Sequence, residues 1–351
     1  MTSNFILISV SLLVLALSAV LIWVSHKSEI LLKKTDLIGV QKFHNKPTPR
    51  IAGVSIFIGF FIGVWLEFGA SVLFYSLLIS SLPVFLLGLI EDLNASVSPS
   101  VRMMGAFISA SLAFFLLDIK VNELGFENVD YVLKNYVLVS FIFTVLAIAV
   151  VINAINIIDG FNGLMIGYSL IVLLSIAFIS FTLGDALILN LSLLLSFSLL
   201  GVFIINFPFG KIFAGDGGAY FIGFMIAIIG LMLGIRNEEI THWFILLLLI
   251  YPLFEVVYSI YRKKVILGIS PSEPDGNHLH MLIYGKLLSS KTMNHSQNKI
   301  NSMTSPFLWL LSLIGIVPAL IWHDNQTILI ATSVIFMITY TIIYRYITKT
   351  T

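Results

Sequence analysis

The amino-acid sequence predicts an all-α, polytopic membrane protein that forms a single transmembrane domain over residues 1–351. Composition is the first indication: 58% of the residues are hydrophobic, 11% are charged and the mean hydropathy is +1.03. Soluble domains carry about 25% charged residues. The second indication is a series of apolar runs near the roughly 20 residues that a membrane-crossing helix needs. The third is the placement of Lys and Arg between these runs.

The apolar runs predict about eleven transmembrane helices. In chain order they cover residues 4–24, 51–68, 70–90, 103–117, 136–155, 164–182, 186–206, 218–235, 242–261, 306–322 and 327–344. The first run has no Lys or Arg before it and no small-residue cleavage site after it. We therefore interpret it as a retained anchor, not as a signal peptide.

Basic residues orient the predicted helices through the positive-inside rule. The segment after the first run carries Lys27, Lys33, Lys34, Lys42, Lys46 and Arg50. This places that segment in the cytoplasm, the N-terminus outside and the C-terminus in the cytoplasm. Of the 19 Lys and Arg residues, all then face the cytoplasm except Lys120, Lys134 and Arg236.

The sequence contains no cysteine, which excludes disulfides, thiolate metal sites and a cysteine nucleophile. The formal net charge of +1 points to no particular partner. Polar clusters lie instead in the predicted cytoplasmic loops, where they indicate an active site at the membrane surface. These loops cover residues 25–50, 91–102, 156–163, 207–217 and 262–305.

The most informative cluster is N-A-I-N-I-I-D-G-F-N-G-L, residues 153–164, which directly follows an apolar run. Polar groups are costly at the mouth of a membrane helix and usually mark a site that handles a charged species. Asn156 and Asp159 are three residues apart and would share one helix face. Glycines beside Phe161 and Asn162 would let a ligand approach the backbone. The alternative is a glycine-rich turn with Asn and Asp caps.

Carboxylates form two further clusters. Glu91 and Asp92 end an apolar run, and adjacent carboxylates near a low-dielectric boundary hold their charge best beside a cation or donor. A divalent metal or the proton of a phosphate could be that partner of the carboxylates. The alternative is a solvated acidic helix end with Arg102 as its ion-pair partner. Asp216 stands among glycines as a hard oxygen ligand that suits magnesium and a substrate phosphate. Its alternative role is a helix N-cap.

The remaining clusters are basic and histidine-rich. Lys46, Thr48 and Arg50 alternate with prolines and offer donors suited to phosphate oxygens, or else a positive-inside anchor. His278 and His280 are two residues apart and make a poor structural zinc site. They could donate hydrogen bonds to a phosphate, or belong to a surface loop without function.

Five motifs follow one another in the chain: H-N-K-P-T-P-R-I-A-G, G-L-I-E-D-L, N-A-I-N-I-I-D-G-F-N-G-L, F-A-G-D-G-G-A-Y-F-I-G-F and D-G-N-H-L-H. Together and in this order, they resemble the polyprenyl-phosphate N-acetylhexosamine-1-phosphate transferases of glycosyltransferase family 4. The resemblance covers about residues 40–285. It implies transfer of a HexNAc-1-phosphate from a UDP-sugar to undecaprenyl (polyprenyl) phosphate, with release of UMP and Mg²⁺ or Mn²⁺ as cofactor. It also implies a bacterial inner membrane, with the active site facing the cytoplasm.

The resemblance also assigns residue roles. Metal ligands would be Asn156 and Asp216. Catalytic residues would be Asp92, Glu91, Asp159, His278 and His280. Substrate-binding residues would be Lys46, Thr48, Arg50, Arg102, Gly160, Phe161, Asn162 and Phe213, with the uracil near Phe213 and the 160–162 turn.

Three positions depart from the family pattern: Glu91 replaces an aspartate, Asn162 replaces a frequent aspartate, and Met281 replaces a third histidine. Asp92 is expected to position the lipid phosphate or accept its proton; a covalent intermediate on a carboxylate is the alternative. Different hypotheses are a membrane transporter or flippase, and an inactive scaffold relative. The sugar, the downstream glycan (such as O-antigen or another cell-wall polymer) and a homodimeric state stay open.

Overall fold

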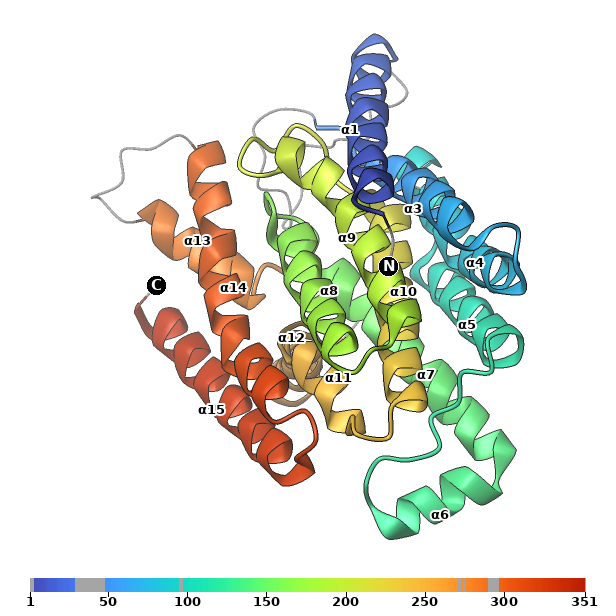
Figure 1. The fold of residues 1–351 in the computed structure, drawn as a ribbon. Helices are drawn as coiled ribbons and strands as arrows, with labels where there is room; N and C mark the ends of the chain where they lie inside the picture. The colour runs from blue at the N-terminus through green and yellow to red at the C-terminus, as the bar shows by residue number, and fades with distance from the viewer. Residues whose placement is uncertain are drawn as a thin grey trace.

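The computed structural model describes residues 3–28, 48–94, 97–270, 273, 275–289 and 297–350, which fold into helices joined by turns (Figure 1). No strand occurs in these ranges. Apolar runs favour helices because a helix satisfies backbone N–H and C=O groups within its own segment, as the bilayer interior requires. The predicted all-α class is therefore confirmed.

The helices follow the predicted apolar runs closely. They are α1 (Asn4–Lys27), α3 (Ala52–Phe68), α4 (Val72–Asn94), α5 (Pro99–Leu116), α6 (Glu127–Asn135), α7 (Val137–Ile157), α8 (Leu164–Thr182), α9 (Ala186–Asn206), α10 (Gly215–Arg236), α11 (His242–Leu248), α12 (Ile250–Tyr261), the π-helix η1 (Arg262–Leu267), α13 (Leu279–Ser289), α14 (Gln297–Ile321) and α15 (Gln326–Thr350).

Within the described ranges, nine helices are long and apolar enough to cross a membrane, and the bent pair α11–α12 would make ten. α3 is apolar but has only 17 residues. The protein is a polytopic membrane protein, while the count of eleven crossings and the orientation of the termini stay predictions.

The predicted continuous helix over 242–261 is wrong at one point, because the chain bends by 74° between α11 and the segment that begins at Ile250. Pro252 explains the break. It has no N–H to donate to the carbonyl of Leu248, four residues earlier, and its ring would clash with that carbonyl in a straight helix. The Leu248 carbonyl instead accepts a hydrogen bond from the buried Tyr168 hydroxyl at 2.6 Å.

α10 lies at the centre of the bundle and contacts α3, α4, α5, α7, α8 and α9 (Figure 1). Small residues bring these helices together, as is common in membrane bundles. A Cβ built on Gly53 of α3 would lie 2.4 Å from the Cα of Gly218. One built on Gly88 of α4 would lie 2.6 Å from the Cα of Gly217. Larger residues there would push α3 or α4 away from the first turn of α10.

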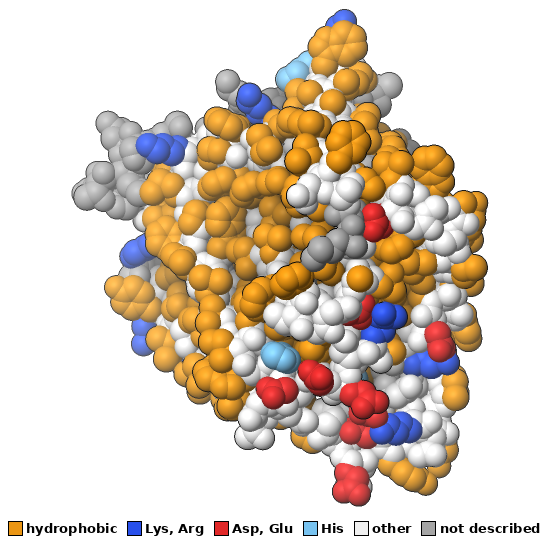
Figure 2. Space-filling view, viewed as in Figure 1, with side chains coloured by type: hydrophobic (Ala, Val, Ile, Leu, Met, Phe, Trp, Pro, Cys, Tyr) orange, Lys and Arg blue, Asp and Glu red, His pale blue; other side chains and the backbone are white. Residues whose placement is uncertain are grey.

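The two ends of the bundle differ. At the end that carries α6, Figure 2 shows acidic side chains gathered below a broad apolar band. There Asp185 accepts hydrogen bonds from Arg236 at 2.8 Å and Asn237 at 3.1 Å. Burial opposes ionisation, but these donors hold the pKa of Asp185 below its ordinary value. The connections α4–α5, α7–α8 and α9–α10, which hold the predicted site residues, lie at the opposite end.

The helix break generates a stability prediction. Tyr168→Phe removes the donor of the Leu248 carbonyl and leaves it buried without a partner, which costs about 1–3 kcal/mol of unfolding free energy. We expect a lower midpoint of thermal unfolding in detergent. Tyr251 is the matched control, because its hydroxyl is buried next to Tyr168 with no hydrogen-bond partner among the described residues. Tyr251→Phe should leave the midpoint unchanged or raise it; equal losses in both variants would contradict this explanation of the break.

Candidate active site

Asp216, in the first turn of α10, is the centre of a polar cluster. Its Oδ1 accepts a hydrogen bond from Asn156 Nδ2 at 3.3 Å and lies 3.5 Å from the Arg50 guanidinium. Its Oδ2 is paired with Arg102. The end of α7, the segment before α3 and the start of α5 therefore converge on one carboxylate. Only 13% of the Asp216 side chain is exposed, and the two guanidinium groups are its ion-pair partners.

Asp92, at the end of α4, holds the start of α10. Its Oδ1 and Oδ2 accept hydrogen bonds from the backbone N–H groups of Asp216 at 2.8 Å and Gly217 at 2.9 Å. The first N–H groups of a helix have no partner within the helix, and a carboxylate satisfies them with favourable dipole geometry. Position 215, just before Asp216 and Gly217, must be glycine. Its φ is +76°, and a Cβ there would lie 2.5 Å from Asp92 Oδ2.

Asp159 reaches the same cluster from the loop between α7 and α8. Its carboxylate accepts a hydrogen bond from the Gly215 N–H, and its Oδ2 is buried with no hydrogen-bond partner in the described part of the chain. Burial raises the pKa of Asp159 to about 6; Asp216 adds to this, while Arg50 opposes it. Asp159 is therefore a buried carboxyl that can hold or release a proton near neutral pH.

Backbone pairing places Arg50 beside this cluster. The N–H of Phe213 donates to Pro49 O at 2.9 Å, and the N–H groups of Ala52 and Gly53 donate to Phe213 O at 3.0 Å and Ala214 O at 2.9 Å. The segment before α3 thus runs alongside the segment before α10. The Phe213 side chain is buried in this arrangement.

Other predicted residues lie around the cluster. Thr48 is half-buried in the segment that leads to Arg50, while Lys46 lies outside the described residues. Glu91 accepts a hydrogen bond from the N–H of Val97, just before α5, at 2.9 Å.

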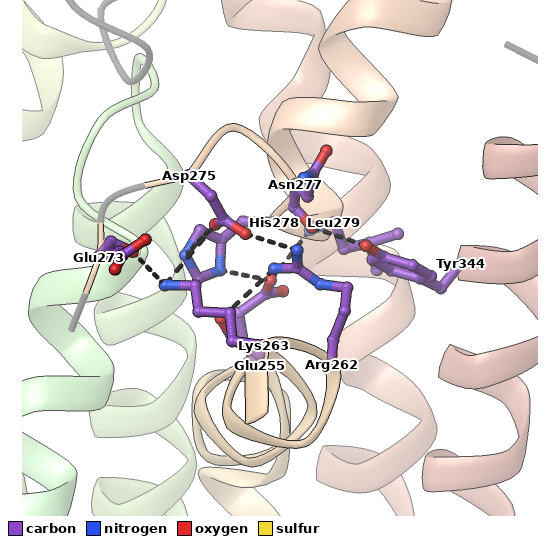
Figure 3. A network of polar contacts seen from close by, with 10 residues as sticks. Glu255, Arg262, Lys263, Glu273, Asp275, Asn277, His278, Leu279 and Tyr344 are labelled. Atoms are coloured by element: carbon purple, nitrogen blue, oxygen red, sulfur yellow. Dashed lines mark hydrogen bonds and ion pairs between the residues drawn. The ribbon is translucent and has the colours of Figure 1, made fainter. Parts of the chain in front are cut away.

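The histidine segment forms a second polar cluster, shown in Figure 3. Glu255 of α12 is almost fully buried, and its Oε1 lies 2.9 Å from His278 Nδ1 and accepts the N–H of Leu279 at 2.9 Å. One carboxylate oxygen therefore fixes both the His278 ring and the start of α13. The sequence showed Glu255 only as an isolated carboxylate near the end of an apolar run.

Basic residues from η1 hold the other side of this cluster. Arg262 pairs with the Asp275 carboxylate, Lys263 lies 3.8 Å from it, and Lys263 also donates to Glu273 O at 2.7 Å (Figure 3). Burial opposes the ionisation of Asp275, but these cations hold its pKa below the ordinary value. A π-helix often marks a functional position, and here both basic side chains are buried against the loop that leads to the histidines.

The two clusters are joined by aromatic contacts. The His278 and His280 rings stack with centroids 5.4 Å apart, and the His280 ring packs edge-on against Phe161 at 5.4 Å. Phe161 is two residues after Asp159. Burial lowers the pKa of His280 to about 4, so this imidazole is neutral at physiological pH.

Asn162 points away from the clusters. Its side chain is fully buried, and its Nδ2 donates to Asn298, Ser302 and Pro208 O. The expected contact with a uracil edge is not open to it in this structure. Gly160 has space instead, because a Cβ built there would meet no atom within 4 Å.

Hard oxygen ligands are available for a metal ion. Among the residues that the structure describes, no group of three His, Cys, Asp or Glu side chains could hold one. Asn156 and Asp216 nevertheless lie in contact, and Asp159 Oδ2 is an unpaired buried oxygen in the same cluster. Mg²⁺ is commonly held by one or two carboxylates together with waters and substrate phosphates. The residues therefore fit a magnesium site that a phosphate substrate would complete.

The chain is similar to several known proteins. Residues 74–234 match the model for "Glycosyl transferase family 4". The chain is 31% identical over 306 residues to the "Probable undecaprenyl-phosphate N-acetylglucosaminyl 1-phosphate transferase" of Bacillus subtilis, covering 85% of this chain and 80% of that protein. It is 27% identical over 264 residues to the undecaprenyl-phosphate alpha-N-acetylglucosaminyl 1-phosphate transferase of Thermotoga maritima, with 74% and 77% covered.

A decaprenyl-phosphate enzyme is also similar. Identity is 27% over 323 residues to the decaprenyl-phosphate N-acetylglucosaminephosphotransferase of Mycolicibacterium smegmatis, covering 82% of this chain and 75% of that protein. The matched family region contains Asp92, Asn156 and Asp216, which the fold brings into one cluster. The chain therefore belongs to glycosyl transferase family 4.

Proposed function

We propose that the protein transfers a HexNAc-1-phosphate from a UDP-sugar to undecaprenyl (polyprenyl) phosphate, releasing UMP and starting a cell-surface glycan. The observation that carries the proposal is the convergence of Asp92, Asn156 and Asp216 with two arginines at one end of the bundle. The similar proteins from Bacillus subtilis and Thermotoga maritima are named as undecaprenyl-phosphate N-acetylglucosaminyl 1-phosphate transferases, the first as a probable one.

The charges of the cluster suit a reaction between two anions. A lipid phosphate oxygen would bond to the β-phosphorus of the UDP-sugar, and the bond from that phosphorus to the bridging oxygen of UMP would break. Arg50 and Arg102 now pair with Asp216 and could turn their guanidinium groups to phosphate oxygens, which they bind in two-pronged geometry. They would reduce the repulsion between the substrates and hold them in line.

Magnesium is the proposed cofactor, with Mn²⁺ as the alternative. Asn156 and Asp216 would hold the ion, which would supply positive charge to the diphosphate and the leaving UMP. Asp159 would hold a proton at its free Oδ2.

The contacts of Asp92 favour a positioning role over a covalent one. Both of its oxygens accept backbone N–H groups of α10, which fixes the carboxylate and lowers its nucleophilicity. We therefore favour direct attack by the lipid phosphate. His278 and His280, fixed by Glu255 and packed on Phe161, would line the opposite side of the diphosphate.

An apolar cavity supports a polyprenyl acceptor. It has a volume of about 380 Å³ and lies between α7, α10 and the α11–α12 pair, lined by residues such as Val151, Gly234 and Leu246. Val151 and Asn156 lie on the same helix, about 7.5 Å apart along its axis at 1.5 Å per residue. The cavity also extends to Lys120 and His242, toward the end that carries α6, so a lipid tail in it would need its phosphate at the Val151 end to reach the acidic cluster.

The proposal places the site at the cytoplasmic face of a bacterial inner membrane, as the distribution of basic residues predicts. An inactive scaffold is less well supported, because Asn162, one of the departures from the family pattern, is buried against α14 and not in the acidic cluster. The chain has no charged pathway through the described bundle that would favour the transporter hypothesis over an enzyme.

The reaction itself is tested with purified protein, undecaprenyl phosphate, Mg²⁺ and a panel of UDP-HexNAc donors. UMP release is expected with at least one donor. Asp216→Asn keeps the size of the side chain but removes its charge, and we expect a loss of about 10²–10³-fold in turnover. Asp324→Asn is the control, since this exposed carboxylate lies at the other end of the bundle. No UMP from any donor, or full activity of Asp216→Asn, would refute the proposal.

The lipid cavity gives a separate prediction. Gly234 lines it, and a Cβ built there meets no atom within 4 Å, so Gly234→Trp should fill the cavity without displacing α10. The KM for undecaprenyl phosphate should rise, while a short-chain prenyl phosphate should react as before. Leu174→Trp, on the exposed face of α8, serves as the control. A similar change in KM for both acceptors would show that the cavity does not hold the lipid tail.

A further inference from the structure

The first turns of α14 carry a line of polar side chains on one face. Asn298, Asn301, Ser302 and Ser305 are three, four and seven residues apart, the spacing of a single helix face. Asn301, Ser302 and Ser305 are buried, although burying polar groups is unfavourable unless they find partners. These residues lie outside the region that matches the family model, which ends at residue 234.

All four side chains bond to a single residue, Asn162. The Asn162 N–H donates to Asn301 Oδ1 at 2.7 Å, and the Ser305 hydroxyl donates to the Asn162 carbonyl at 2.6 Å. Asn162 Nδ2 donates to Asn298 Oδ1 and Ser302 Oγ, both at 2.9 Å. We call these four residues the α14 clamp. The backbone of Asn162 is thus satisfied by a helix about 140 residues away in the chain, as the sequence separations of 139 and 143 show.

The clamped loop is the one that carries site residues. Asp159 and Phe161 precede Asn162 and face the acidic cluster and His280. On the other side, the Gly163 N–H donates to Asn206 Oδ1 at 2.7 Å. An irregular loop has no ladder of its own to satisfy its backbone groups, so these outside partners decide its conformation.

We propose that the α14 clamp positions the loop of residues 158–163 and thereby sets the affinity of the site for the UDP-sugar. Asn301 and Ser305 are the positioning residues, because their hydrogen bonds hold the backbone of the loop. The effect on affinity rests on the proposed function, whereas the effect on the loop does not. Loss of one hydrogen bond of the α14 clamp should make the loop more mobile. Asp159 and Phe161 would then be displaced from their positions near Asp216 and His280.

The test compares two identical substitutions on one helix. Ser305→Ala removes the donor to Asn162, while Ser312→Ala removes an equally buried hydroxyl that donates only to Leu308 O of α14 itself. Hydrogen exchange of the peptide over 158–164 is measured by mass spectrometry in the full-length protein. Exchange should become about 5- to 30-fold faster in Ser305→Ala, the factor for one buried hydrogen bond, and stay unchanged in Ser312→Ala.

Kinetics supply the second readout. In Ser305→Ala, the KM for the UDP-sugar should rise about 5- to 30-fold while the KM for undecaprenyl phosphate stays constant. Ser305→Thr keeps the hydroxyl and should restore both the exchange rate and the KM. Equal exchange in the two alanine variants, or an equal change in both KM values, would overturn the proposal. If the wild-type protein releases no UMP, the proposed function fails, but the exchange comparison still decides whether α14 holds the loop.

Discussion

The structure depends on how the first backbone N–H groups of α10 are satisfied. They lie at the edge of the apolar bundle, where an unpaired N–H group is unfavourable, and Asp92 accepts two of them. This interaction joins α4 to α10 and allows Gly53 and Gly88 to pack directly on the first turn. It also fixes Asp216, so that Asn156, Arg50 and Arg102 converge on a carboxylate that cannot move independently.

The same requirement explains the polar contacts elsewhere at this end. Glu255 satisfies the start of α13, the α14 clamp satisfies the loop at Asn162, and Tyr168 satisfies the carbonyl freed by Pro252. In each case a side chain from a distant helix completes the hydrogen bonds of an irregular backbone segment. Irregular backbone in a membrane protein is tolerated where other parts of the protein supply its partners. The loops of the site are therefore held by the bundle and not by their own turns.

Local patterns in the sequence predicted the helices and the polar loops, since apolar length and basic residues are local signals. The structure brings Asp92, Asn156 and Asp216 together, as the shared placement of their loops led us to expect. The break at Leu249 was missed, although Pro252 marked it. The burial of Asn162 could not be predicted, because its partners on α14 are about 140 residues away and their helix-face spacing does not reveal which residue they contact.

The ion pairs of Asp216 have a consequence for how a substrate would enter. Arg50 and Arg102 each have an anionic partner within the protein, the carboxylate of Asp216. An incoming diphosphate would exchange one anionic partner for another at both guanidinium groups. Recognition would then be a competition between two anions for the same cations, and the buried Asp216 carboxylate would need another positive charge once the arginines turn to the diphosphate.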